Sequence, residues 1–175
     1  MRKREEILHT GEIEAQKRFG AENAWSEISL NQMFGTAVPI GLEDFLEAQK
    51  FFFIATADNA GNCDCSFRGR ETDVNGKPLP VVKVLDRTHL VFPDFSGNNL
   101  FNSLGNILVN PHIGMLFIDF EHIMRYRLNG KADIIEDTTL YRHLWPTAQR
   151  YILVTVDQVY GNCKARIPLM SEKCL

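Results

Sequence analysis

Short turns between segments of β-type sequence constrain the fold of this chain most. Residues 51–57, FFFIATA, are aromatic and β-branched, and a DNAG turn signal separates them from residues 62–68, which alternate strictly. A second pair of such segments, 81–85 and 89–92, follows with an equally short turn. Connections this short join antiparallel neighbours, because a parallel crossover needs a dozen or more residues. The sequence therefore predicts two β-hairpins.

Later segments extend this sheet. Residues 113–120, 124–135 and 151–160 are strand-like, and Asn129-Gly130 indicates a bulge within the second of them. Six or seven strands with short turns favour a mainly β fold with flanking helices, built as an antiparallel barrel. The chain has no GxGxxG or Walker-type loop, so a dinucleotide-binding parallel sheet and a P-loop enzyme are not expected.

The first fifty residues have a helical pattern, with helices expected around 12–17 and 42–46. A chain of 175 residues with 45% hydrophobic residues can bury one sizeable core. We expect a single domain, 1–175, with residues 1–50 as a helical N-terminal extension packed on the barrel.

The formal net charge of -3 argues against a nucleic-acid-binding or membrane-surface protein, because both depend on a basic excess. No apolar run approaches the roughly 20 residues that cross a bilayer, and no signal peptide is recognisable. We expect a cytoplasmic protein without nucleic-acid or membrane partners.

Four irregularly spaced cysteines do not make a disulfide scaffold in a chain of this size. Cys63 and Cys65 share one face of a predicted strand, and no nearby histidine completes a metal-ligand pattern. We expect buried, reduced thiols and no metal site. Alternation places Asp64, Ser66 and Arg68 on the opposite face.

Residues 95–111 carry no charge but contain five asparagines, two serines and two glycines. A solvated connector of this length normally carries charges, so these polar groups are expected to face a ligand. The pattern predicts a helix over 99–109 that Asn98 caps and Asn110-Pro111 ends. Gly105 in its middle would allow a backbone or ligand to approach closely.

One face of that helix carries Asn102, Ser103 and Asn106, which offer amides and a hydroxyl. Basic residues also alternate within the strands, and Arg68 is the clearest candidate for a phosphate ligand because its guanidinium donors suit phosphate oxygens. A solvent-facing strand is the alternative explanation for Arg68. No nucleophile and base pair is recognisable, so catalytic residues are unknown and a bound cofactor is expected to supply any chemistry.

Three segments, FFFIATADNAGNCDCSFRGRE, VVKVLDRTHLVFPDFSGNNLFNSLGNILVNPHIGMLFIDFE and RYRLNGKADI, resemble successive motifs of the pyridoxamine-phosphate-oxidase-like, FMN-binding split-barrel proteins. The resemblance spans about residues 51–133. It implies a homodimer of Greek-key split barrels, with FMN as the cofactor in a groove at the subunit interface.

The resemblance also implies cofactor contacts residue by residue. Ser66 and Arg68 would lie on the strand that faces the flavin, and Asn102 and Ser103 stand where the oxidase itself has an Arg-Lys pair for the phosphate. The implied cofactor-binding residues are Ser66, Arg68, Val82, Lys83, Val84, Asn98, Asn102, Ser103, Arg127 and Asn129. The residues on the later strand would come from the other subunit.

Two departures from the family argue against vitamin B6 oxidation itself: the missing Arg-Lys pair, and the lack of a recognisable pyridoxal-phosphate-binding tail after Tyr160. The leading hypothesis is an FMN-dependent oxidoreductase that passes hydride or electrons between an NAD(P)H-type donor and a small molecule. The alternatives are a non-catalytic flavin- or haem-binding or sensing protein, and an oligonucleotide-binding barrel, which the acidic balance disfavours.

Overall fold

The computed structural model describes residues 1–171, and the chain divides after Gly35 into two compact units. The first unit consists of the helices α1 (Arg4–Ile7), α2 (Thr10–Arg18) and α3 (Glu27–Met33). It has a small core of its own around Ile7, Leu8 and Leu30. The helix predicted around 12–17 is therefore confirmed, whereas its packing on the barrel stays a prediction.

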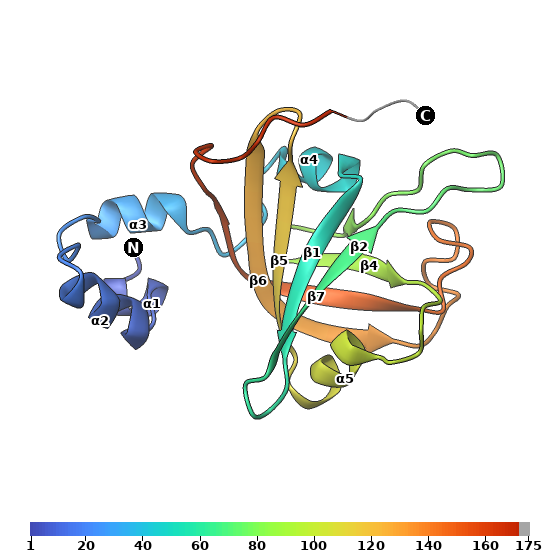
Figure 1. The fold of residues 1–175 in the computed structure, drawn as a ribbon, viewed down its shortest axis with the longest axis horizontal. Helices are drawn as coiled ribbons and strands as arrows, with labels where there is room; N and C mark the ends of the chain where they lie inside the picture. The colour runs from blue at the N-terminus through green and yellow to red at the C-terminus, as the bar shows by residue number, and fades with distance from the viewer. Residues whose placement is uncertain (172–175) are drawn as a thin grey trace. The chain divides into compact units, whose positions relative to one another are not determined.

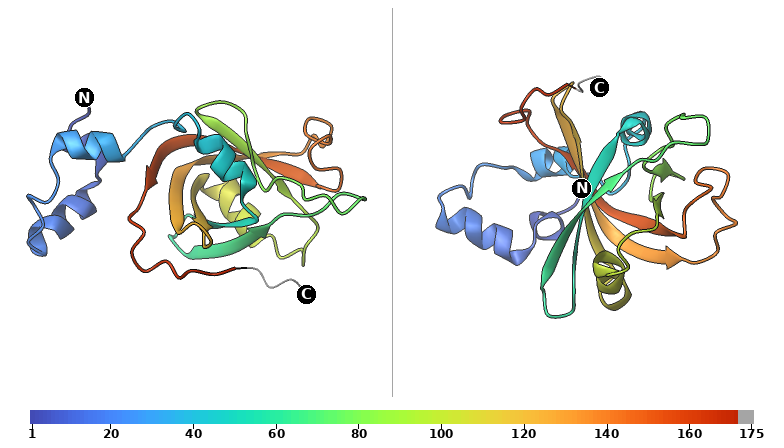
Figure 2. Two further views of the ribbon diagram at one scale, coloured as in Figure 1. Left: turned by 90° about the horizontal axis from the view of Figure 1, so that it is seen from above. Right: turned by 45° about the vertical axis from the view of Figure 1, so that its right-hand side comes forward.

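The second unit is built on one antiparallel sheet with the strand order β2-β1-β5-β6-β7-β4-β3 (Figure 1). Its strands are β1 (Phe51–Ala57), β2 (Cys63–Gly69), β3 (Lys83–Val84), β4 (His89–Asp94), β5 (His112–Asp119), β6 (Met124–Ile135) and β7 (Arg150–Gly161). Figures 1 and 2 show this sheet curled on itself. The predicted mainly β, antiparallel split barrel and both hairpins are confirmed.

Two helices accompany the barrel, α4 (Leu42–Ala48) and α5 (Asn102–Val109), and they lie near opposite ends of β1 (Figure 1). The Asn106 side-chain amide donates to Thr56 Oγ1 over 3.1 Å and so ties α5 to β1. None of the helices within residues 1–171 is long and apolar enough to cross a membrane.

Aromatic side chains fill the inside of the barrel. Phe52 stacks on Phe117 with ring centroids 5.0 Å apart and meets the edge of Phe92 at 5.3 Å. A second apolar cluster surrounds the fully buried Trp145, whose indole N–H donates to the Pro80 carbonyl over 2.7 Å. Together these clusters hold the strands that carry the polar residues described below.

The predicted bulge in β6 lies at Asn129/Gly130, where the register against β7 shifts. A Cβ atom at Gly130 would come within 2.1 Å of the Thr155 carbonyl oxygen. The backbones approach so closely here that only glycine fits without moving a strand.

The prediction of buried thiols is wrong for Cys63 and Cys65, which are both exposed. Their strand, β2, is an edge strand of the sheet, and the face that they share with Phe67 is not covered by the described chain. Alternation correctly separates this face from that of Asp64 and Ser66. It does not tell which face the rest of the barrel covers.

The uncharged helix begins later than its pattern predicts. Asn99 and Phe101 have φ values of 61° and 54°, so the backbone is left-handed just before α5 starts at Asn102. Asn98 does not cap the helix but accepts the Leu100 N–H over 3.1 Å within the preceding loop. The predicted end is confirmed, because α5 stops at Val109 before extended Asn110.

Candidate functional site

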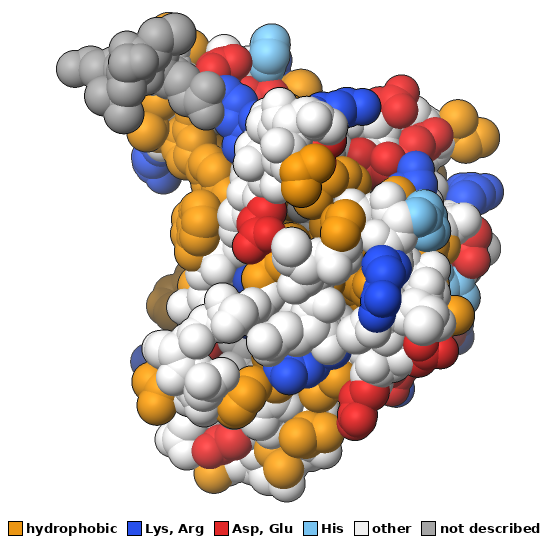
Figure 3. Space-filling view, turned by 90° about the vertical axis from the view of Figure 1, so that its right-hand side faces the viewer, with side chains coloured by type: hydrophobic (Ala, Val, Ile, Leu, Met, Phe, Trp, Pro, Cys, Tyr) orange, Lys and Arg blue, Asp and Glu red, His pale blue; other side chains and the backbone are white. Residues whose placement is uncertain are grey.

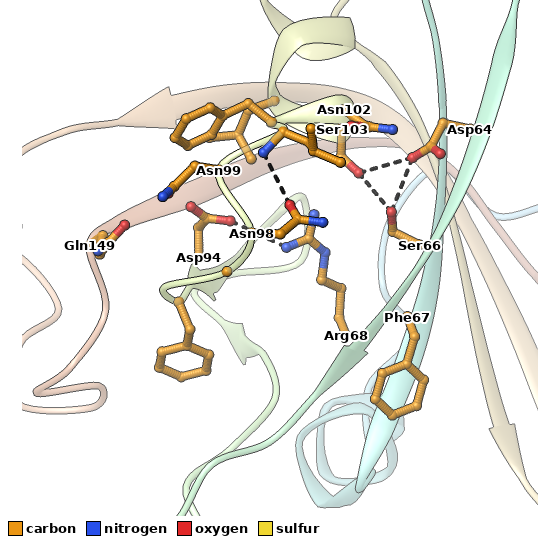
Figure 4. Close-up of a pocket in the computed structure, with 15 residues that line it drawn as sticks. Asp64, Ser66, Phe67, Arg68, Asp94, Asn98, Asn99, Asn102, Ser103 and Gln149 are labelled. Atoms are coloured by element: carbon orange, nitrogen blue, oxygen red, sulfur yellow. Dashed lines mark hydrogen bonds and ion pairs between the residues drawn. The ribbon is translucent and has the colours of Figure 1, made fainter.

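A cavity of about 310 Å³ lies where β2, the end of β4, the loop 95–101 and the start of α5 meet (Figure 4). It includes five of the residues implied as cofactor ligands: Ser66, Arg68, Asn98, Asn102 and Ser103. The sheet brings β2 to this place, and the left-handed residues before α5 turn the helix start toward it.

One wall of the cavity is a cluster of three oxygen atoms from Asp64, Ser66 and Ser103. Ser66 Oγ lies 3.0 Å from Asp64 Oδ2 and 2.9 Å from Ser103 Oγ, and Ser103 Oγ lies 3.3 Å from the same carboxylate oxygen. Ser103 is buried, whereas the other two side chains are half-buried. This cluster links the start of α5 to the inner face of β2.

A second wall carries charges that neutralise one another. Buried Asp94 accepts from Arg68 Nη1 over 3.2 Å through one oxygen and from Arg150 Nη1 over 3.0 Å through the other. Asp94 and Arg150 face each other directly across the β4 and β7 pair. The guanidinium of Arg150 also lies over the Phe101 ring, 5.3 Å from its centroid. These contacts hold the side chains of Arg68 and of Phe101, the residue that precedes α5, in place.

The Nε–H group of Arg68 is buried and has no hydrogen-bond partner among the described residues. A buried donor without a partner costs free energy, so a ligand oxygen that accepts from it would be favourable. A guanidinium offers such a donor to phosphate or carboxylate oxygens in a fixed geometry.

The start of α5 adds backbone donors to the cavity. The first turn of a helix leaves its N–H groups without intrahelical partners, and the helix dipole favours a negative charge there. No side chain caps α5, and its first turn holds no acidic residue. Asn102 adds an exposed side-chain amide at this end.

No close approach of another part of the described chain explains the glycine at position 105. A Cβ there would meet nothing within 4 Å outside the backbone of its own helix. Contact of this position with a ligand stays a prediction.

Three of the implied cofactor residues lie away from the cavity, in and beside β3. Val82 is fully buried in the barrel core. Lys83 Nζ forms an ion pair with Glu47 Oε2 on α4 at 2.9 Å, and the Val84 N–H donates to Glu47 Oε1 over 3.0 Å. The described chain therefore already supplies Lys83 with an acidic partner.

Two further implied residues lie on β6, outside the cavity. Arg127 is exposed, stacks on the Tyr160 ring at 5.7 Å and donates to the Tyr160 hydroxyl over 3.3 Å. The Asn129 amide donates to Gln158 Oε1 over 3.0 Å. Their contact with a cofactor of another subunit stays a prediction.

Sequence reasoning missed several polar residues of the site: Asp64, Asp94, Asn99, Gln149 and Arg150. Alternation within β2 did place Asp64 on the face of Ser66 and Arg68, and Asn99 lies in the uncharged segment 95–111 whose polar groups were expected to face a ligand. Asp94 and Arg150 meet only through the pairing of β4 with β7, which the sequence does not reveal.

Charged side chains are scattered over the face shown in Figure 3, between broad white areas of backbone and uncharged polar side chains. Within residues 1–171, no group of three or more His, Cys, Asp or Glu side chains is placed to hold a metal ion. The cavity is a mixed polar site, in which Arg68 and the start of α5 bring donors and Asp64 and Asp94 bring acceptors.

Comparison with solved structures shows the same fold in distant proteins. HupZ of group A Streptococcus aligns with a TM-score of 0.53 at 16% identity, covering 71% of this chain and 93% of its own. A proposed pyridoxamine 5'-phosphate oxidase of Lactobacillus delbrueckii gives 0.54 at 15% identity, covering 72% and 95%. A Clostridium acetobutylicum protein related to general stress protein 26 gives 0.50 at 14% identity, covering 70% and 86%.

No curated protein matches the sequence. The sequence model described as pyridoxamine 5'-phosphate oxidase matches residues 40–166, which include the whole sheet and the cavity. The split barrel agrees with that match. The chain therefore belongs to the pyridoxamine 5'-phosphate oxidase family.

Proposed function

We propose that this protein is an FMN-binding flavoprotein and an oxidoreductase that uses FMN to transfer hydride or electrons between an NAD(P)H-type donor and a small molecule. The observation that carries the proposal is the cavity in which Arg68, whose buried Nε–H has no partner among the described residues, lies beside the start of α5. An anion is the partner that both groups favour.

The phosphate of FMN fits these donors. Arg68 would hold it through Nε while its Nη1 remains on Asp94, and the first N–H groups of α5 together with Asn102 would complete its oxygen contacts. Asp94 keeps the guanidinium in one orientation, so little side-chain entropy is lost when the anion binds. Uncharged Asn102 makes this site less basic than the Arg-Lys pair of the oxidase itself would.

The rim of the cavity suits the flavin ring. Leu100 and Phe101 line it and are exposed by 72% and 46% of their surface. Apolar side chains at a polar cavity favour a ligand with a charged end and a flat apolar end. Bound FMN supplies the redox chemistry, and the protein holds and orients it.

Two copies of the chain would complete the groove. The exposed face of edge strand β2 carries Phe67, Cys63 and Cys65, and the Phe67 ring lies beside those of Phe51 and Phe53, with centroids 5.2 and 5.9 Å away. Exposed aromatic faces at a sheet edge favour association. We place Arg127, Asn129 and the β3 residues at the groove of this homodimer.

Haem is disfavoured as the ligand of this cavity. Haem iron is held by His, Cys, Met or Tyr, and none of these residue types lines the cavity. A flavin needs no such ligand, so the same donors and rim accommodate it.

The first experiment is a fluorescence titration of the purified protein with FMN. Arg68→Ala should weaken FMN binding about 10- to 100-fold, the loss typical of a hydrogen bond to a charged group, and Asn102→Ala should weaken it less. Arg142→Ala, an exposed arginine outside the cavity, is the matched control and should have no effect. Unchanged affinity in both cavity variants would refute the phosphate assignment.

Two further measurements test the remaining claims. Bleaching of the bound flavin by NAD(P)H, followed by recovery with an acceptor, supports turnover, whereas a flavin that NAD(P)H leaves oxidised supports a binding protein. Light scattering should give twice the 20.0 kDa of one chain. A monomeric mass at micromolar concentration would contradict the shared groove.

A further inference from the structure

The cluster of Asp64, Ser66 and Ser103 has fewer hydroxyl protons than oxygen–oxygen contacts. Its three oxygens make three contacts of 2.9 to 3.3 Å, yet only the two serine hydroxyls bring a proton when the carboxylate is ionised. An ionised carboxylate accepts hydrogen bonds and cannot donate them. The cluster is most fully satisfied when both serine protons stay within it, which makes two hydrogen bonds from three contacts.

Each arrangement that keeps both protons within the cluster has the same consequence for the cavity. Both hydroxyls can donate to Asp64, or one serine can donate to the other, which then donates to Asp64. In each case Ser66 and Ser103 have no proton left for a ligand and offer only lone pairs. This wall of the cavity therefore consists of hydrogen-bond acceptors.

A phosphate is a poor partner for such a wall, because its oxygens are acceptors and its charge repels that of Asp64. A hydroxyl group of a ligand is a good partner, because it donates a hydrogen bond and carries no charge. Ser103 is only 3% exposed, so a hydrogen bond made to it is largely shielded from water.

We infer that Asp64, through Ser66 and Ser103, makes this wall the recognition site for a hydroxyl-bearing chain, while Arg68 and α5 take the anion. The inference rests on the proposed function and deepens it, since in FMN the hydroxyl-bearing chain is the ribityl group. It also divides the site differently from the sequence-based expectation, which assigned Ser103 to the phosphate.

The charge balance of the cavity agrees with this division. Asp94 is paired with both Arg68 and Arg150, and Asp64 adds a further negative charge at the cavity, so the charged groups here have no basic excess. A site for a bare phosphate would be expected to have a basic excess. Ligand affinity here must come partly from uncharged groups.

Three flavins separate the contributions in one titration series. Lumiflavin has neither hydroxyls nor phosphate, riboflavin adds the ribityl chain, and FMN adds the phosphate. The riboflavin-to-lumiflavin affinity ratio therefore reports the hydroxyl chain, and the FMN-to-riboflavin ratio reports the phosphate. Because each ratio is taken on one protein, partial unfolding of a variant cancels.

Ser103→Ala should lower the riboflavin-to-lumiflavin ratio about three- to tenfold and leave the FMN-to-riboflavin ratio unchanged. Asp64→Ala should lower the first ratio and raise the second, because it removes a negative charge and frees two serine protons to donate to phosphate. Asp133→Ala, at an exposed aspartate on β6 outside the cavity, should change neither ratio.

The outcomes distinguish this inference from the proposed function. If the wild-type protein binds FMN but riboflavin no tighter than lumiflavin, the hydroxyl site is refuted and the flavin proposal stands. A drop in the FMN-to-riboflavin ratio for Ser103→Ala would also refute the inference, since Ser103 would then donate to the phosphate. Binding of none of the three flavins would refute both.

Discussion

Replacing Asp94 by alanine tests whether the cavity depends on its ion pairs. Asp94 is 5% exposed and accepts from Arg68 and Arg150 over 3.2 and 3.0 Å. The substitution removes both acceptors and leaves two guanidinium groups that are themselves only about one-fifth exposed without their carboxylate. We expect lower stability of the barrel and a displaced start of α5.

The magnitude follows from the burial of the pair. Breaking a fully buried ion pair costs about 3 to 5 kcal/mol, and an exposed pair contributes about 0 to 1 kcal/mol. Water still reaches both arginines, so we expect an intermediate loss of about 2 to 3 kcal/mol for Asp94→Ala. For a chain of this size that corresponds to a fall in Tm of roughly 4 to 12 °C.

Urea denaturation followed by Trp145 fluorescence measures this loss in the barrel alone. Trp145 is fully buried in the cluster that contains Tyr151, whereas Trp25 belongs to the N-terminal unit, so the measurement uses a Trp25→Phe background. Arg150→Ala and the double variant with Asp94→Ala complete a double-mutant cycle, with a coupling of about 1 to 2 kcal/mol expected.

A small effect would refute the reasoning. If Asp94→Ala costs less than about 0.5 kcal/mol, the ion pairs behave like surface pairs and do not hold Arg68 in place. Asp94→Asn is the isosteric comparison, since it keeps one acceptor, and we expect it to be less destabilising than alanine.

Two further predictions concern the backbone and the acid stability. Gly130→Ala should destabilise the barrel by about 3 kcal/mol or more in the same urea assay, because its Cβ would meet the Thr155 carbonyl at 2.1 Å, whereas Gly105→Ala should stabilise it by about 1 kcal/mol. Hydrogen bonds from the backbone N–H and the hydroxyl of Thr88, and then from the His89 side chain, lower the pKa of Asp86 from 3.8 to about 2. This stabilisation is present above pH 3.8 and lost as pH falls through about 2, so Asp86→Asn should flatten acid unfolding in that window.

The sheet could be predicted because its signals are local. Alternation, β-branched residues and short turns determine each hairpin within about 20 residues. The dipeptide Asn129-Gly130 alone indicates the bulge. The prediction of where α5 starts was wrong because its start depends on contacts with distant residues. Phe101 is left-handed although it is a bulky residue, and Arg150 from a distant strand lies over its ring.

Lys83 illustrates a limit of reading charges within strands. The sequence-based expectation gave Lys83 a cofactor as its partner. Within the described chain, Lys83 pairs with Glu47 at 2.9 Å, on a helix 36 residues earlier in the chain. Nothing in the local pattern of either residue indicates that they meet.

The site shows the same division between local and distant information. The alternation of β2 predicts that Asp64, Ser66 and Arg68 share a face, but the chemistry of each depends on what packs opposite. Ser103 approaches Ser66 from α5 and turns two potential donors into acceptors, while Asp94 holds Arg68 by one nitrogen and leaves Nε for a ligand. The sequence therefore predicts which polar residues share a face, whereas the direction of each hydrogen bond, and with it the proposed choice between a phosphate and a hydroxyl, depends on partners that only the folded structure brings together.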